Sequence, residues 1–449
     1  MRISVLGQAS TLAVVAALCA DAAHAQEQQA QAPAPLIYSQ SGGLLMMSLP
    51  DLPSGVVDGG GPVASSGSKV IPGMMVGLDL GRNLGRFGDM DIVGNLSFFI
   101  GTGNDTTTSQ TVLSGQGTIQ FSANAPSTAT IALSTDPAGV TATTDVTLAL
   151  PGGGAINTQS ATSAPGGGSQ VLYGVVLTGD NTGAVFGGVA TNGATGAASA
   201  FGAAADPSGF TFLGTGDLTG MRITSEVFRS FAYMGADASI GLSPPSINAL
   251  SFTPYLSVGY RLLNQEIGSR TTFDLPEPAG ATPFPLLGLQ RVEHLDTNYY
   301  GGGVGLAVSH TLDNGITLSG AAEAGLRAFD ASYSGRDLAI FPINNGGLET
   351  QRFDVGRASA DEHGVAWFAK GEAGFNFPLA PNLLLGFTGS VEYLSKVPAL
   401  ARTAPDVQVS QAGGVTNVNF GGGANAQGTS IVFTDSWNFG LKATLSGAF

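Results

Sequence analysis

Apolar and polar residues alternate one by one along several segments of this chain, and most of these segments come in pairs. Four pairs are each joined by a short turn: Met74–Leu80 with Ile92–Ile100, Phe228–Leu242 with Leu250–Leu262, Tyr300–Val308 with Ile316–Ala328, and Val365–Phe377 with Leu383–Tyr393. Because a period of two places successive side chains on opposite faces of a strand, each pair predicts a β-hairpin with one apolar face. The turn Asp313-Asn314-Gly315 supports the third hairpin, since Asn-Gly tolerates positive φ.

The last thirteen residues form the clearest single strand. One face carries Trp437, Phe439, Leu441, Ala443, Leu445, Gly447 and Phe449, and the other face carries mostly polar or small residues. A final strand that ends on an aromatic residue resembles the closing strand of Gram-negative outer-membrane β-barrels, porin-like or OmpA-like in the broad sense. The resemblance identifies no subfamily. It implies that the barrel-assembly machinery reads Trp437, Phe439, Leu441, Leu445 and Phe449.

Long polar connections alternate with the short turns. They are Thr102 to about Asp217, Gly268–Arg291, Gly335–Glu362 and Pro398–Ser430. This asymmetry is typical of transmembrane antiparallel up-and-down barrels, whose long loops face outward. If the last strand ends in the periplasm, a periplasmic N-terminus requires one more strand, and Leu36–Leu49 is the apolar segment available. We therefore expect an all-β barrel of ten strands, within a range of eight to twelve. A soluble β-sandwich is the alternative fold.

The N-terminus has the features of a secretory signal peptide. Arg2 gives a basic start, Leu12–Leu18 an apolar stretch, and Ala23-His24-Ala25 a cleavage pattern. Cys19 is the only cysteine, so cleavage after Ala25 leaves a chain without thiols or disulfides. We expect residues 26–35 to be a disordered spacer and residues 36–449 to form the barrel.

The composition suits a membrane barrel and excludes a polyanion-binding protein. The chain has 67 glycines and only 11% charged residues, and after the signal no apolar run approaches the roughly 20 residues of a membrane helix. Loss of Arg2 and Asp21 with the signal leaves the net charge at −15. Nucleic acid requires a basic surface, so we expect outer-membrane lipid, and no nucleic acid, as a partner.

The segment from Asn104 to Thr215 is a long insert. It contains five aspartates and no Lys, Arg, Glu or His, together with short β-like runs such as 118–121 and 171–177. Connections of this length are usually functional or disordered. Three interpretations remain open: a flexible surface loop, a small β-rich unit standing on the barrel, or a plug inside it.

If the apolar faces meet lipid, the opposite faces line the lumen. This places ten charged residues inside: Asp79, Arg229, Asp237, Arg261, Glu323, Arg327, Lys370, Glu372, Glu392 and Lys442. The set contains as many basic as acidic residues, although the whole chain is strongly acidic. Charges in a narrow lumen are costly unless they are paired, which favours a salt-bridge network that fills the interior. The alternative is a narrow channel whose charges select ions.

No residue pattern predicts an enzyme, a cofactor or a metal site. Asp361-Glu362-His363 is the best candidate for a general base, but a solvated acidic loop is the preferred interpretation of it. Ser66-x-x-Lys69 is a candidate for a serine nucleophile, but it lies in a Gly/Ser-rich segment. The remaining histidines are scattered along the chain, which does not favour a metal site. We therefore expect a barrel with a structural or surface-exposed role in the cell outer membrane. A narrow porin-like channel is the second hypothesis, and a surface hydrolase a weaker third. The surface ligand is not predicted.

Overall fold

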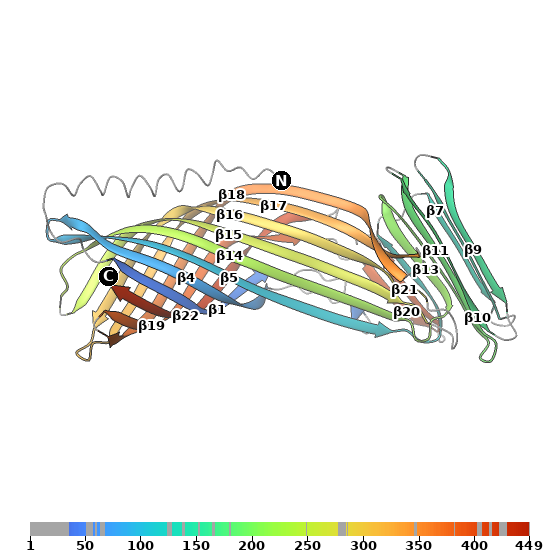
Figure 1. Cartoon of the computed structure of the whole chain (residues 1–449), viewed down its shortest axis with the longest axis horizontal. Coiled ribbons are helices and arrows are strands. Elements are labelled where there is room, and N and C mark those ends of the chain that lie inside the picture. The colour runs from blue at the N-terminus through green and yellow to red at the C-terminus, as the bar shows by residue number, and fades with distance from the viewer. Residues whose placement is uncertain are drawn as a thin grey trace.

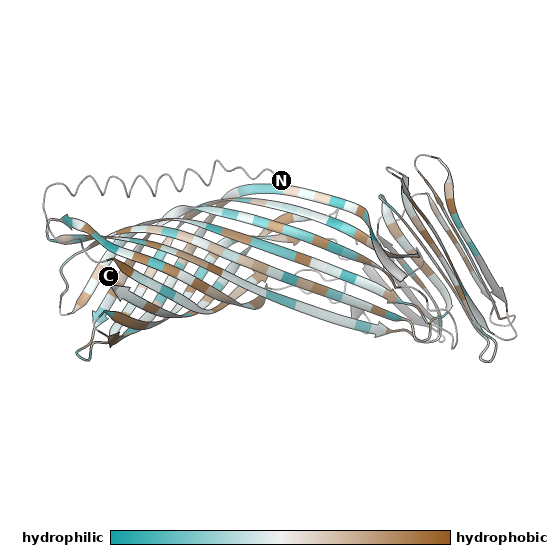
Figure 2. Ribbon diagram, in the orientation of Figure 1, coloured by the Kyte–Doolittle hydropathy of each residue, from teal (hydrophilic) through white to brown (hydrophobic). Residues whose placement is uncertain are grey.

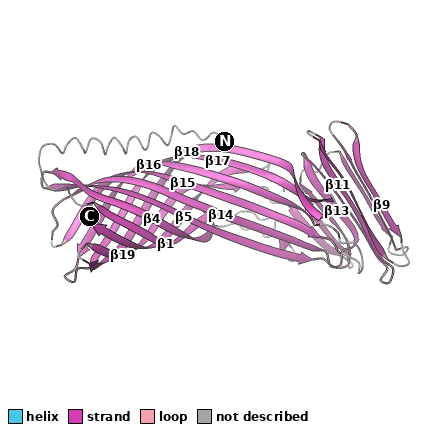
Figure 3. Cartoon of the chain, viewed as in Figure 1, coloured by secondary structure: helices cyan, strands magenta, loops and turns pink. Residues whose placement is uncertain are grey.

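The computed structural model describes residues 36–448 except 51–56, 59–60, 63–67, 124–127, 137–139, 151–152, 164–166, 179–180, 248, 277–283, 285, 345–347, 381, 402–405, 413–414 and 422–428. Every regular element in this part of the chain is a strand (Figure 3). No helix in it is long and apolar enough to cross a membrane. The predicted signal peptide, the predicted spacer and Phe449 lie outside the described residues.

Ten strands form a closed antiparallel barrel (Figure 1). Their order around the barrel is β1 (Ile37–Pro50), β22 (Ser430–Ala448), β19 (Leu383–Ala401), β18 (Leu348–Ala380), β17 (Thr317–Asn344), β16 (Leu287–Thr311), β15 (Leu250–Asp274), β14 (Arg222–Ser243), β5 (Met90–Val112) and β4 (Ser68–Phe87). The pairing of β1 with β4 closes the ring. The predicted all-β, antiparallel fold is confirmed.

All four predicted hairpins are formed, as β4–β5, β14–β15, β16–β17 and β18–β19. Their turns gather at one end of the barrel, which we call the short-turn end. In the β16–β17 turn, Gly315 has a φ of +82°, and the Asn314 side chain accepts a hydrogen bond from the Ile316 amide. Gly315 therefore has the positive φ that the sequence predicts for this turn. Val57–Asp58 (β2) and Gly61–Pro62 (β3), two residues each, form a separate antiparallel pair.

The predicted ends of the strands are wrong at the opposite end of the barrel. The stretches 268–291 and 335–362 were expected to be polar loops, but β15 continues to Asp274, β16 starts at Leu287, and β17 and β18 are separated only by residues 345–347. In 398–430, β19 continues to Ala401 and two further strands follow. The barrel strands extend beyond the part of the wall whose outer face is apolar. In these extensions the outer-facing residues are polar, so the composition there resembles that of loops.

The outer wall changes from apolar to polar along the barrel axis (Figure 2). Towards the short-turn end, exposed apolar residues cover it: Leu44, Met74, Val76, Phe98, Ile100, Ile240, Leu256, Val258, Val304, Leu306, Leu326, Val365, Trp367, Phe375, Trp437, Phe439, Leu441 and Leu445. We call this set the apolar belt. Farther out, the same faces carry polar residues, as where Ala328 on β17 is followed by Asp330, Ser332 and Ser334. From Trp437 to Leu445 the belt spans roughly 20 Å along the axis, given about 3.3 Å per residue and a tilted strand.

The predicted insert starts too early, because residues 104–112 continue barrel strand β5. Residues 116–217 form most of a β-rich unit at the end opposite the short turns (Figure 1). One sheet has seven strands in the order β10 (Gly168–Thr178), β11 (Asn181–Asn192), β12 (Ala197–Asp206), β13 (Gly209–Asp217), β6 (Gln116–Ala123), β21 (Val415–Gly421) and β20 (Asp406–Ala412). The other sheet has three, β7 (Ala129–Asp136), β8 (Thr141–Ala149) and β9 (Ala155–Ser163). Val146 and Leu148 of β8 pack on Val185 of β11, so the two sheets share an apolar layer. We call the two sheets together the cap.

The cap and the barrel share a core of aromatic residues. Phe121 and Phe212 of the cap contact Phe273 at the end of β15, with ring centroids 5.2 Å and 4.8 Å apart. Phe210 contacts Phe341 of β17 at 5.8 Å. Of the three interpretations left open for the insert, the structure shows a folded unit standing on the barrel. It is not an isolated unit, since its core continues into the barrel wall.

Removing residues 116–217, which form the cap apart from β20 and β21, should leave a barrel that assembles but has a weakened outer end. Gly115 O accepts a hydrogen bond from Leu218 N at 2.9 Å, so residues 116–217 can be replaced by a short Gly-containing turn. The ring strands stay intact, and loop length adds little to the cost of closure. Phe273 and Phe341 lose apolar partners, however, so we expect a lower unfolding temperature and new chymotryptic cleavage near them. Heat-modifiable gel mobility and limited proteolysis measure both effects. Failure to assemble would mean that the cap is required for barrel folding.

Candidate functional site

The structure gathers most of the ten predicted lumen charges in one layer inside the barrel. Seven of them line a chamber of about 140 Å³: Asp79, Asp237, Arg261, Lys370, Glu372, Glu392 and Lys442. Arg327 lies next to this chamber, bonded to Glu392, and Glu323 accepts hydrogen bonds from Ser257 and Tyr255. Arg229 is the exception. It lies nearer the cap, where it donates to Pro50 O and to Gln265 Oε1, each at 2.5 Å.

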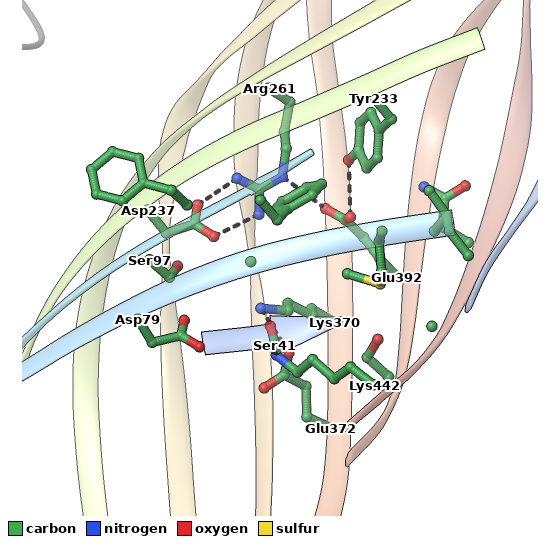
Figure 4. Close-up of a pocket in the computed structure, with 18 of the residues that line it drawn as sticks. Ser41, Asp79, Ser97, Tyr233, Asp237, Arg261, Lys370, Glu372, Glu392 and Lys442 are labelled. Atoms are coloured by element: carbon green, nitrogen blue, oxygen red, sulfur yellow. Dashed lines mark hydrogen bonds and ion pairs between the residues drawn. The ribbon is translucent and has the colours of Figure 1, made fainter. Parts of the chain in front are cut away.

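An ion-pair network with good geometry forms the centre of this layer (Figure 4). Arg261 donates to both oxygens of Asp237, at 2.6 Å and 2.7 Å. Glu392 accepts from Arg327 Nη1 at 2.7 Å and from the Tyr233 hydroxyl at 2.9 Å, and its Oε1 lies 3.8 Å from Arg261 Nε. Bidentate and charge-assisted hydrogen bonds of this kind are the strong ones in proteins. The four charges therefore compensate one another across strands β14, β15, β17 and β19.

Each of the two buried guanidinium groups stacks on an aromatic ring. The Arg327 guanidinium carbon is 3.9 Å from the centroid of Phe368, and that of Arg261 is 4.9 Å from Phe99. Both arginines are almost fully buried. Stacking on a ring offsets part of the cost of removing the guanidinium from water. The network is thus a structural element with a polar side and an apolar side.

On its polar side, the charged layer opens towards the short-turn end. Lys370 and Glu372 form an ion pair at 3.0 Å. Beyond them, Asp79, Glu372 and Lys442 line a vestibule of about 280 Å³ whose other residues include Thr388, Asn376 and several serines. A site of this size with many polar partners can hold water. The short-turn half of the lumen is therefore a polar vestibule that ends at the ion-pair network.

On its other side, the charged layer meets an apolar plug that the sequence analysis missed. Inward-facing residues of β14 to β18 form it, including Phe231, Leu263, Leu295, Tyr299, Phe329 and Ala366, all buried. The signal was present in the sequence, because Leu263, Leu295 and Phe329 continue the alternation past the predicted strand ends. In these parts of the strands the apolar side chains lie on the inner face and no longer on the outer one. In the sequence this change of face looks like the end of the strand.

Strand ends that turn into the lumen complete the plug. The β18–β19 pairing stops at Phe368 and Leu394, and the β19–β22 register shifts between Leu394 and Val397. Beyond this point residues 397–400 are buried. Lys396 O accepts from Tyr299 OH at 3.0 Å, and Pro398 O accepts from Gln265 Nε2 at 3.3 Å. The outer ends of β19 and β22 thus reach the far wall, formed by β15 and β16, and cross the interior.

A second buried ion pair lies between the plug and the cap. Arg291 donates to Asp337 through Nε at 2.7 Å and Nη2 at 3.1 Å. Glu293 on the same strand accepts from Tyr333 OH at 2.8 Å. Sequence reasoning assigned Arg291 and Asp337 to loops and therefore did not include them among the interior charges.

The residues considered for catalysis do not converge. Asp361 and His363 are exposed on the polar part of the outer wall, and Lys69 forms an ion pair with Asp105, while Ser66 lies outside the described residues. In the described part of the chain, no group of three His, Cys, Asp or Glu residues is arranged to hold a metal ion. Of the predicted assembly residues, Trp437, Phe439, Leu441 and Leu445 are all exposed in the apolar belt.

Comparisons with known proteins assign the chain to no family. No family model matches it, and no curated protein matches it. Solved structures that resemble it include the outer membrane protease OmpT from Escherichia coli, with 10% identity and a TM-score of 0.28 over 94% of this chain and 99% of that one. A FadL homologue from Pseudomonas aeruginosa has 12% identity and a TM-score of 0.22 over 92% and 90%. The toluene transporter TodX from P. putida has 8% identity and a TM-score of 0.18 over 93% and 90%.

Proposed function

We propose that this protein is an integral outer-membrane β-barrel with a structural or surface-exposed role, a closed lumen and no catalytic activity. The polarity of its wall carries the proposal. Around the belt the outer face is apolar and the inner face is charged, whereas farther out Asp330 and Ser332 face outward and Phe329 and Ala331 face inward. A wall that meets lipid in one half and water in the other requires this reversal. A soluble barrel would keep its apolar face inside along its whole length.

The orientation follows from the same features. The short turns lie at the edge of the belt, and the long strands with the cap extend from its other edge. Outer-membrane barrels have short periplasmic turns and long extracellular segments. The cap would therefore stand outside the cell, where its neutral and acidic surface contacts the environment.

A closed lumen follows from what fills it. The ion-pair network spans four strands, and the apolar plug lies directly behind it. Water or ions crossing the barrel would have to pass buried Phe329 and Tyr299 and the inward-turned end of β19. Barrels of about eight strands are filled by side chains, and this ring of ten resembles them in that respect.

Planar-bilayer recording tests the closed lumen. We expect no steady conductance from the purified protein. As a positive control, residues 395–436 can be replaced by a short turn, which removes the inward-turned ends of β19 and β22. This replacement also removes β20 and β21, so conductance in this variant would place the barrier within residues 395–436. Steady conductance of the unaltered protein would contradict the closed lumen and leave the membrane assignment intact.

A narrow channel is the second candidate function, and the vestibule is the observation that favours it. Asp79 and Lys442 line a polar chamber at the short-turn end that reaches the ion-pair network. If the plug moves, these charges would be the first that an ion meets. Changing Lys442→Glu should then shift cation selectivity in any conductance that is recorded, and would have no effect on a protein that stays closed.

Deleting Phe449 should sharply reduce assembly. Trp437 and Leu445 are exposed on the outer wall, and the alternation of the sequence predicts that Phe449 belongs to the same set, which we propose the assembly machinery recognises. We expect the deletion to lower the heat-modifiable, folded population in the outer membrane. Phe449→Tyr, which keeps an aromatic ring, is the matched control. Normal assembly of the deletion variant would count against the outer-membrane assignment.

A further inference from the structure

A groove is hollowed in the outer wall of the barrel at the edge of the apolar belt. Its volume is about 870 Å³, and it crosses strands β1, β4, β5, β14, β15 and β16. It lies where the outer faces of these strands change from apolar to polar. Its lining residues include none of the ion-pair network or the vestibule, and Phe231 is the one residue of the apolar plug's buried cluster among them.

Small side chains on the middle strands make the floor shallow. Thr102 on β5 pairs in register with Ala232 on β14, and Asn104 pairs with Ser230. On one side of this floor stand Leu44 and Met74, which are 55% and 72% exposed. These two residues belong to the apolar belt, so this side of the groove continues into the surface that we propose meets lipid.

The opposite side of the groove carries acceptors. Glu266 on β15 pairs with His294 on β16, and one step towards the belt Asn264 pairs with Asp296. The two carboxylates are therefore diagonal neighbours on adjacent strands, where such positions are about 7–8 Å apart. Asn264 Oδ1 is enclosed and has no hydrogen-bond partner among the described residues. The described residues that line the groove include no lysine or arginine.

We propose that this groove binds a cationic amphiphile, with its ammonium group between Glu266 and Asp296 and its hydrocarbon chain along Leu44 and Met74. An ammonium ion at about 3 Å from each carboxylate fits a diagonal pair of this separation. The apolar wall removes the chain from water, which rewards binding in proportion to the area covered. Anionic head groups would meet two carboxylates without a compensating cation. The position of the groove at the lipid surface rests on the proposed outer-membrane function, but its chemistry does not.

The test measures 1:1 binding of dodecylammonium, whose primary ammonium group can donate hydrogen bonds to both carboxylates, to the full-length protein by native mass spectrometry at pH 8. Dodecyl sulfate and dodecanol are the comparison probes with the same chain. We expect the cationic probe to bind at least tenfold more tightly than either. The variant carrying both Glu266→Gln and Asp296→Asn should lose this preference and bind the three probes alike.

Asp361→Asn is the matched control. Asp361 shares a row with Asp296, since both pair with Ser332, yet it lies outside the groove. Binding should be unchanged in this variant. Ala232→Trp fills the floor and should abolish binding of all three probes while both carboxylates remain. Circular dichroism and heat-modifiable mobility verify folding. The proposal is overturned if the double variant keeps the preference, if Asp361→Asn loses it, or if Ala232→Trp binds normally. None of these outcomes depends on conductance or localisation.

Discussion

Replacing Glu392 by alanine should be the most destabilising single change in the barrel interior. The substitution leaves two buried guanidinium groups, Arg261 and Arg327, without the carboxylate that lies between them, and removes the acceptor of the Tyr233 hydroxyl. Breaking a buried ion pair by removing one partner costs about 3–5 kcal/mol. Denaturant unfolding in lipid vesicles, followed by tryptophan fluorescence, measures the loss in the free energy of unfolding.

Two controls separate the buried network from charge in general. Glu392→Gln keeps an acceptor for Tyr233 and removes only the charge, so its loss of stability should be smaller. Arg86→Ala breaks the exposed ion pair with Asp91 at the short-turn end and should have no measurable effect. If Glu392→Ala were as harmless as Arg86→Ala, the charged layer would be hydrated and open, and the channel hypothesis would gain.

Leu441→Arg should be destabilising by about 2–4 kcal/mol, which is the cost of a basic residue on the lipid face near the middle of the bilayer. Leu441 lies midway between Trp437 and Leu445 on the last strand and is 57% exposed. The same unfolding measurement applies, and a lower yield of folded protein in the membrane should accompany it.

Thr444→Arg is the control for the lipid face. Thr444 lies three residues away on the same strand, but its side chain lines the vestibule, where an arginine finds space and the carboxylates of Asp79 and Glu372. We expect little change in stability. Equal effects at the two positions would mean that the outer wall does not meet lipid, and the outer-membrane proposal would fail with them.

Local alternation was sufficient to predict the hairpins and the direction in which their side chains point. A period of two has a physical cause within a few residues, because the pleat turns neighbours to opposite faces. This is why Asp237, Arg261 and Glu392 could be placed on one inner face before their contacts were known. The turn at Asn314-Gly315 is local in the same way.

The lengths of the strands and the contents of the lumen could not be read from the same signal. In the proposed membrane orientation, the solvent outside changes where the wall leaves the lipid, so polar residues such as Asp330 lie on the outer face there and apolar residues such as Phe329 on the inner one. Apolar and polar residues still alternate there, but the apolar ones occupy the inward-facing positions. Only the neighbouring strands and the solvent show which face points inward. The sequence analysis therefore ended the strands where the outer face ceased to be apolar.

Contacts between distant parts of the chain required the tertiary structure. Strand β21 joins the cap by parallel pairing of Val415 with Gln116, and the end of β19 reaches Gln265 across the lumen. Neither contact can be predicted from the residues near it in the sequence, since the free energy of closing such long loops depends on the whole fold. Sequence alone determined a β-barrel with a charged inner face and an apolar belt. The register and the inward turn of two strand ends determined that the charges are paired and that the space behind them is filled.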